Sequence, residues 1–92
     1  DRLFWQSPLA IRFGAGETLY GIEAIRSYRQ ARSPEDIRRT LRNTTITTFS
    51  EDFAITTTEF ERNGQPTGRQ TQTWVRFSDG WRIVSAHVSF SI

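Results

Sequence analysis

GRQTQTWVRFSDGWRIVSAHVSFSI, residues 68–92, contains two runs rich in threonine, valine, isoleucine and aromatic residues, separated by Ser78-Asp79-Gly80. Residues of this kind favour β-strands, and Asp-Gly between two such runs is a strong hairpin signal. The stretch therefore predicts an antiparallel hairpin with strands over 68–77 and 81–92.

The preceding part of the chain repeats this pattern. TLRNTTITTF (40–49) and FAITTTEFE (53–61) flank Ser50-Glu51-Asp52, a gap of hairpin length, and RNGQPTG (62–68) provides a longer turn into the next strand. We therefore predict a four-stranded antiparallel meander from residue 40 to the end of the chain.

The first forty residues have a different pattern. LAIRF (9–13) alternates apolar and other residues with the period of a half-buried strand, and GIEAIRSYRQA (21–31) places isoleucines on one helical stripe. Ser33-Pro34-Glu35-Asp36 resembles a helix start, with a capping hydroxyl, proline and acidic residues, and predicts a second, short helix.

These elements define one α+β domain over residues 1–92, in which a helix covers one face of a curved antiparallel sheet. A strongly curved sheet under a helix leaves a conical pocket. Because the chain opens without methionine, on what reads as the end of a helix, we expect a domain truncated at its N-terminus.

Twelve arginines and no lysine stand against ten acidic residues, for a formal net charge of +2. Arginine provides forked recognition of carboxylate or phosphate. A small anionic partner is therefore expected; nucleic acid is not, because the net charge is small and no basic face interleaves with aromatic residues.

The composition also argues against several other classes. The chain has no cysteine and one histidine, whereas a zinc site needs three or four ligands, so we expect no metal and no cofactor. No apolar run approaches the roughly 20 residues that span a bilayer, and no secretory signal is visible. We expect no membrane partner and a cytoplasmic location.

Three segments carry a resemblance to a known family: FWQSPLAIRFGAGETLYGIEAIRSYR, TTITTF and GRQTQTWVRFSDGWRIVSAHVS. Together they resemble the AtzH-like (oxalurate-catabolism HpxZ-like) branch of the NTF2-like, or SnoaL-like, superfamily. The resemblance implies a cystatin-like cone, a homodimer formed through the sheet, and small carboxylated ureas or amides as ligands, often beside a partner amidase. The resemblance also implies a preceding helix that lids the cone, and we expect no counterpart to it in this sequence.

Arg12 and His87 are the candidate catalytic residues. Arg12 stands between apolar neighbours in a predicted strand, where burial of an unpartnered charge is costly, so we expect it to face a cavity. The resemblance makes it the substrate-facing cation. The imidazole of His87 is a side chain suited to proton transfer, but a sole histidine in a strand is also typical of a core or interface residue.

Further residues are candidates for substrate binding: Arg29, Tyr28, Gln72 and Trp74. Arg38, Arg39 and Arg42 are interpreted as a solvated basic edge. Glu59 is the one strand carboxylate that could enter the cone as a base, although an exposed position is the simpler interpretation.

The register of the last hairpin decides where His87 faces. A two-residue Asp79-Gly80 turn places His87 opposite Gln72, whereas a three-residue loop with a bulge places it opposite Thr71. The sequence leaves both registers open.

Three functions follow from these features. The first is an enzyme that decarboxylates or hydrolyses a small carboxylated urea or amide held by Arg12. The second is a non-catalytic dimeric ligand-binding or assembly module. The third, isomerase-like chemistry on an apolar ligand, depends on Glu59 and fits the arginine content poorly.

Overall fold

The structure is a computed structural model that describes residues 2–32, 39–62 and 64–91. Its elements are β1 (Ile11–Phe13), β2 (Thr18–Tyr20), α1 (Ile22–Gln30), β3 (Thr40–Phe49), β4 (Phe53–Glu61), β5 (Gly68–Phe77) and β6 (Gly80–Phe90). The four strands of the meander and the helix lie within two residues of their predicted bounds. The short helix predicted at Ser33-Pro34-Glu35-Asp36 lies outside the described residues.

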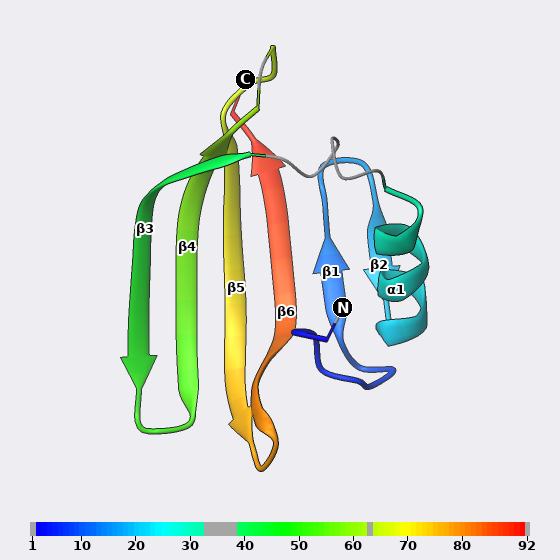
Figure 1. Cartoon of the computed structure of the whole chain (residues 1–92), viewed down its shortest axis with the longest axis vertical. Helices are drawn as coiled ribbons and strands as arrows, with labels where there is room; N and C mark the ends of the chain where they lie inside the picture. Colours follow the sequence, from blue (N-terminus) through cyan, green and yellow to red (C-terminus); the bar gives the residue numbers. More distant parts are fainter. Residues whose placement is uncertain (1, 33–38, 63, 92) are drawn as a thin grey trace.

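All six strands form one sheet in the order β2-β1-β6-β5-β4-β3 (Figure 1). The meander β3-β4-β5-β6 is antiparallel, as predicted, but β1 joins it by running parallel to β6. The short strand β2, which the sequence did not indicate, pairs with β1 at the sheet edge. Pairing with β6 places Arg12 beside Ala86, which is distant in sequence.

The last hairpin has a register that combines features of both predictions. Phe77 pairs with Gly80, so the loop is Ser78-Asp79 rather than either predicted loop. A bulge then leaves Val84 unpaired, because Trp74 pairs with Ile83 and Thr73 with Ser85. His87 consequently lies opposite Thr71, as in the predicted register with a bulge.

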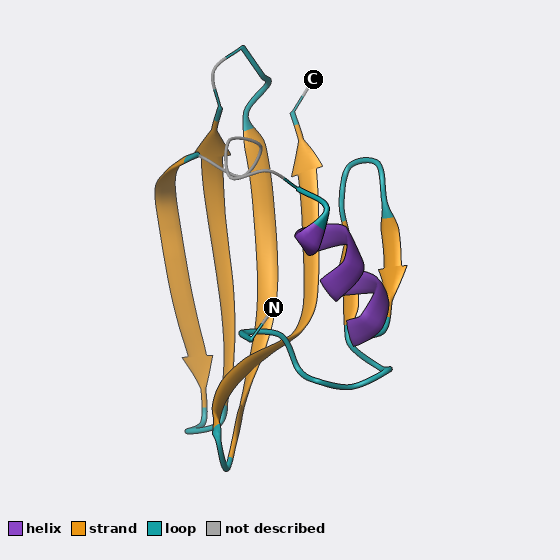
Figure 2. Cartoon of the chain, turned by 45° about the vertical axis from the view of Figure 1, so that its right-hand side comes forward, coloured by secondary structure: helices purple, strands orange, loops and turns teal. Residues whose placement is uncertain are grey.

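Helix α1 packs on one face of the sheet, over β1 and β2 (Figure 2). Ile22 and Ile25 are its buried residues, with Glu23 in the first turn and Arg29 in the last turn, where each charge suits the helix dipole. Gly21 precedes the helix at φ +90°, a conformation that favours glycine. The core below α1 consists of Phe4, Ala10, Ile22, Ile25, Ile83 and Ala86.

The two faces of the sheet differ in character. The inner face, toward α1, carries the buried side chains of Ala54, Phe60, Ile83, Ala86 and Val88. The outer face carries their strand neighbours, among them His87. Beyond α1, every residue of β3 is exposed, so the inner face is covered at the β1-β2 end and open at the β3 end.

Candidate functional site: an arginine-lined cavity

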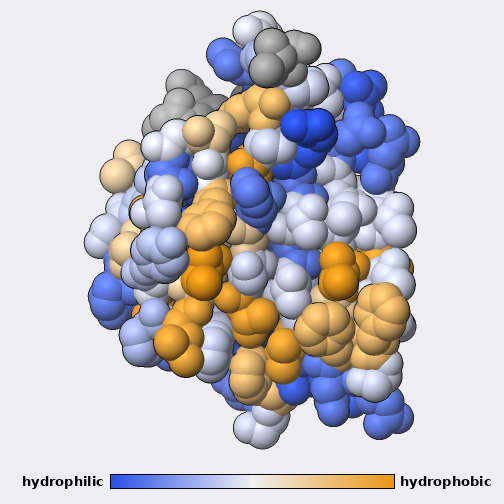
Figure 3. Space-filling view, turned by 180° about the vertical axis from the view of Figure 1, so that it is seen from behind, coloured by the Kyte–Doolittle hydropathy of each residue, from blue (hydrophilic) through white to orange (hydrophobic). Residues whose placement is uncertain are grey.

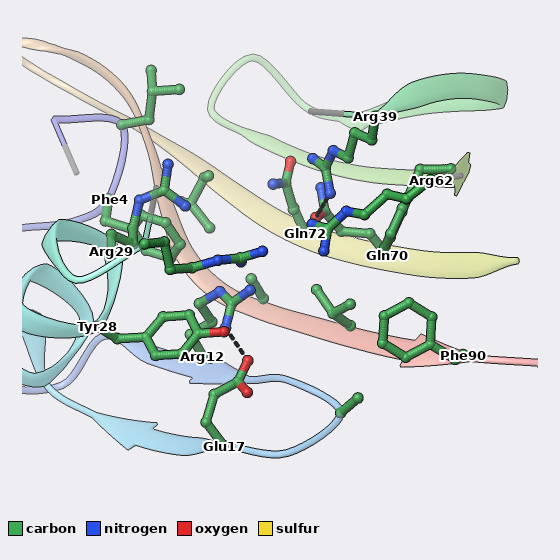
Figure 4. Close-up of a pocket in the computed structure, with 17 residues that line it drawn as sticks. Phe4, Arg12, Glu17, Tyr28, Arg29, Arg39, Arg62, Gln70, Gln72 and Phe90 are labelled. Carbon is green, nitrogen blue, oxygen red and sulfur yellow. Dashed lines mark hydrogen bonds and ion pairs between the residues drawn. The ribbon is translucent and has the colours of Figure 1, made fainter. Parts of the chain in front are cut away.

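A cavity of about 380 Å³ lies on the inner face of the sheet, next to α1 (Figure 4). This volume falls in the range of small-molecule sites. Cations dominate its polar lining. Among the residues that the structure describes, the charged lining consists of five arginines and one glutamate: Arg12, Arg29, Arg32, Arg39, Arg62 and Glu17. Apolar side chains of β4, β6 and the N-terminal segment complete the wall.

Arg12 reaches the cavity because of its position in β1. Its neighbours Ile11 and Phe13 pair with Ser85 and His87 and share their outer face, so Arg12 points inward beside Ala86. Only 7% of Arg12 is exposed, and its guanidinium lies 5.1 Å from the centre of the Tyr28 ring. The apolar residues of this strand therefore face outward, and the charge faces inward.

Glu17 is the counter-ion of Arg12. Arg12 Nη1 donates to Glu17 Oε1 at 2.7 Å. Burial raises the pKa of Glu17. The hydrogen bond and charge of Arg12, together with hydrogen bonds from Tyr28 and the Gly16 backbone, lower it by more than burial raises it, so the pKa lies below its ordinary value. The carboxylate rests against Gly14, where a Cβ atom would collide with it.

A second group of cations lies toward the end of β4. Arg39 Nη1 donates to Gln70 Oε1 at 3.1 Å, and the guanidinium groups of Arg39 and Arg62 both lie over the Phe60 ring. Burial and then the charges of the other cavity arginines, Arg62 first, lower the pKa of Arg39. Burial and the charges of Arg12 and Arg32 likewise lower the pKa of Arg29. The cavity therefore concentrates positive charge that an anion would relieve.

Gln72 forms part of the cavity floor, and Trp74 supports it. The indole N–H of Trp74 lies 3.2 Å from Gln72 Oε1 and 3.3 Å from Thr56 Oγ1, and Thr56 donates to the same glutamine oxygen at 3.2 Å. Trp74 packs against the core and is not itself a lining residue.

His87 lies away from this cavity. It is exposed on the outer face, where its ring meets the edge of Phe13 with centroids 5.8 Å apart. The register and the parallel pairing of β1 place His87 and Arg12 on opposite faces of the sheet. The structure therefore brings together Arg12, Arg29, Tyr28 and Gln72 but not His87.

Other charged residues are also located. Glu59 interacts with Arg42 and Asn43 outside the cavity. This agrees with the expectation that Glu59 stays out of the cone and that Arg42 belongs to a solvated edge. Arg39 differs from the expected solvated edge, because it turns over Phe60 into the cavity. Arg38 lies outside the described residues.

Sequence reasoning missed five polar cavity residues: Glu17, Arg32, Arg39, Arg62 and Gln70. Glu17 has a recognisable signal, since it follows the Gly14-Ala15-Gly16 turn directly after the strand that carries Arg12. Arg39, Arg62 and Gln70 meet through the pairing of β4 with β5 and through the contacts of Arg39 with Gln70 and Phe60, which only the tertiary structure creates.

The lining can bind oxygen-rich anions. Among the described lining residues, only Glu17 and Tyr28 have side chains other than arginine that exchange protons.

Across residues 2–32, 39–62 and 64–91, no cluster of three histidine, aspartate or glutamate residues suited to a metal ion is found. No helix in that part of the chain is long and apolar enough to cross a membrane.

An α+β architecture of one mixed sheet and a helix, with a cavity on the face that the helix covers, is that of the NTF2-like, or cystatin-like, class of proteins. This chain is a member of that superfamily. The chain belongs to the AtzH-like family, whose model matches residues 1–92. Both the predicted fold and the predicted family are thereby confirmed.

Solved structures agree with this membership. A protein of unknown function of the DUF3225 family from Pectobacterium atrosepticum is 53% identical, with a TM-score of 0.93 over 99% of this chain and 72% of that protein. A cystatin-like fold protein from Burkholderia xenovorans is 48% identical, with a TM-score of 0.88 over 96% and 70% of the two chains.

More distant similarity concerns the fold alone. An NTF-2 like protein of unknown function from Shewanella oneidensis is 22% identical, with a TM-score of 0.70 over 96% of this chain and 78% of that one. No curated protein matches the chain.

Proposed function

We propose that the chain binds and processes a small carboxylated urea or amide, by decarboxylation or amide hydrolysis, in nitrogen or ureide catabolism. The observation that carries this proposal is the buried guanidinium of Arg12, which lies in a cavity whose described lining includes four other arginines and one carboxylate, Glu17. The AtzH-like resemblance supports the ligand class. A cytoplasmic location and a partner amidase belong to the same proposal.

Arg12 would hold the ligand carboxylate and stabilise negative charge that develops during the reaction. Its Nη1 is engaged by Glu17, so an incoming carboxylate would meet the remaining N–H groups. Because His87 lies on the outer face, proton transfer would fall to Glu17, Tyr28 or water rather than to histidine.

Arg12→Ala and Arg12→Lys test this assignment. Oxamate, which carries a carboxylate and an amide carbonyl, serves as the binding probe. We expect Arg12→Ala to abolish both oxamate binding and turnover of a carboxylated urea, while circular dichroism shows that the variant remains folded. Arg12→Lys keeps the charge but loses the fork, so about tenfold weaker binding is expected. Arg26→Ala is the matched control, because Arg26 pairs with Glu23 on the surface. Normal binding and turnover in Arg12→Ala would rule the assignment out.

A second candidate function is a non-catalytic dimeric ligand-binding module, and the position of His87 favours it. The outer face shown in Figure 3 carries apolar patches among polar side chains. Tyr20 and Phe49 are 66% and 54% exposed on this face. Such residues fit pairing with a second copy of the chain through the sheet.

Measuring the mass in solution together with turnover distinguishes the enzyme from the non-catalytic dimeric module. A dimer that binds oxamate without releasing a product would support the module, whereas product release supports the enzyme. We expect Tyr20→Arg and Phe49→Arg to lower the dimer fraction in analytical ultracentrifugation. A wild-type chain that stays monomeric at all concentrations would contradict the dimer.

A further inference from the structure

The orientation of the Gln72 side chain is determined by its neighbours. An indole N–H only donates hydrogen bonds, so the atom that Trp74 meets at 3.2 Å must be the amide oxygen of Gln72. The Thr56 hydroxyl donates to the same oxygen at 3.2 Å. With its oxygen occupied by two donors, Gln72 has only its amide N–H groups left for other partners.

Those N–H groups are available to a ligand. Gln72 lines the cavity, and within the described part of the chain no protein acceptor is found for its amide nitrogen. This nitrogen is not one of the buried polar atoms of the described residues that lack a partner, so it is accessible from the cavity.

Gln72 also has a defined position relative to Arg12. Both residues pair with Ala86, Gln72 from β5 and Arg12 from β1, so the three form one row across neighbouring strands on the inner face. Neighbouring strands lie about 4.8 Å apart, which puts the Cα atoms of Arg12 and Gln72 about 10 Å apart. The small side chain of Ala86 leaves space between the two larger ones.

We propose that Gln72 is a specificity-determining residue whose amide N–H donates to a carbonyl oxygen of the ligand, and that Trp74 and Thr56 are positioning residues that hold this donor in place. The inference rests on the proposed function and narrows its ligand class. The favoured ligand places a carboxylate at Arg12 and, a few atoms away across Ala86, a carbonyl oxygen at Gln72.

Two probes of similar shape test the inference. Oxamate carries a carboxylate and an amide carbonyl, whereas isobutyrate replaces the amide oxygen and nitrogen by methyl groups. Calorimetric titrations of both probes would use the wild-type chain, Trp74→Phe and Thr56→Val. Trp74→Phe keeps an aromatic ring without the N–H, and Thr56→Val keeps the shape without the hydroxyl. Trp81→Phe is the matched control, because the centre of the Trp81 ring lies 5.9 Å from the Arg76 guanidinium and, among the described residues, Trp81 forms no hydrogen bond to Gln72 or Thr56, unlike the Trp74 indole.

We expect the wild-type chain to prefer oxamate. Loss of one positioning hydrogen bond frees the amide to rotate, so Trp74→Phe and Thr56→Val should each weaken oxamate binding about three- to tenfold. Isobutyrate binding should change less than about twofold in both variants, because its only polar group is the carboxylate at Arg12. Trp81→Phe should match the wild-type chain for both probes.

The possible failures are distinguishable. Equal wild-type affinity for the two probes, or both positioning variants keeping the wild-type preference, would overturn the role of Gln72 while leaving the proposed function intact. Equal weakening of both probes would indicate general damage to the cavity and would also overturn it. Failure of the wild-type chain to bind either probe would overturn the proposed function itself.

Discussion

The guanidinium of Arg12 and the carboxylate of Glu17 form an ion pair of 2.7 Å across the Gly14–Gly16 turn, with both side chains largely removed from solvent. A buried charge without a partner is strongly destabilising, so Glu17 allows Arg12 to remain in the cavity wall. The pair engages one nitrogen of Arg12 and leaves the others for an anion.

Glu17→Gln should reduce the pH dependence of stability. The pKa of Glu17 is lowered in the folded state, so its contribution to stability is present above its ordinary value of 4.5 and is lost as the pH falls through the folded value. Near neutral pH we expect the variant to lose about 1–3 kcal/mol of unfolding free energy. As the pH falls from about 6 into the acid range, the wild-type chain should lose more unfolding free energy than the variant.

Urea unfolding at several pH values measures this difference. Glu23→Gln is the control, because Glu23 is an exposed carboxylate paired with Arg26 on the surface. Parallel pH profiles for the wild-type chain and Glu17→Gln would contradict the assigned pKa direction.

Gly14→Ala should displace the Glu17 carboxylate. A Cβ atom at Gly14 would overlap that carboxylate, which lies at the end of a flexible side chain and can move away. We therefore expect a folded protein whose stability has a weaker pH dependence, as in Glu17→Gln. Gly16→Ala meets nothing nearby and should behave as wild type in the same urea titrations. Identical behaviour of the two alanine variants would refute this packing argument.

Arg39→Gln should weaken anion binding without lowering stability. Burial and the charges of neighbouring arginines lower the pKa of Arg39, so its removal relieves repulsion among the cavity arginines. This relief offsets the loss of its hydrogen bond to Gln70 and of its contact with Phe60. An anion loses an attractive charge, and oxamate affinity should fall about tenfold at low salt, with a smaller change at high salt. Titration calorimetry at two salt concentrations measures this effect. Arg42→Gln is the control, since Arg42 pairs with Glu61 at 2.9 Å outside the cavity; equal affinities of the two variants would count against the prediction.

Gly68→Ala should destabilise the fold. A Cβ atom at Gly68 would collide with the ring of Phe60, which is fully buried and pairs across from it in β4. Overpacking of this kind costs about 1–3 kcal/mol. Thermal unfolding of Gly68→Ala and of the control Gly16→Ala measures this loss of stability. Equal melting temperatures of the two variants would contradict the close packing of Gly68 on Phe60.

His87→Gln should leave oxamate affinity within about twofold of wild type, because its side chain lies on the face opposite Arg12 and interacts with Phe13 instead of the cavity. Calorimetric titration tests this, with Arg12→Ala as the positive control for loss. A large loss of affinity in His87→Gln would require a ligand site on the outer face.

The local pattern of the chain predicted most of its elements. Alternation and turn residues identified the four strands of the meander, and the spacing of Ile22 and Ile25 identified α1. Such signals lie within a few neighbouring residues, where hydrophobic periodicity is informative. The charge of Arg12 among apolar residues also indicated a cavity, since an inward arginine needs partners.

The site itself depended on contacts between distant segments. The sequence alone determined an α+β meander with a helix and singled out Arg12. Only the tertiary structure decided that β1 runs parallel to β6, that Val84 bulges and that His87 therefore faces outward. It also decided that Arg39 and Gln72 join Arg12 around one cavity. The physical reason is that a strand fixes which residues share a face, whereas the partner strand and its register determine which residues meet.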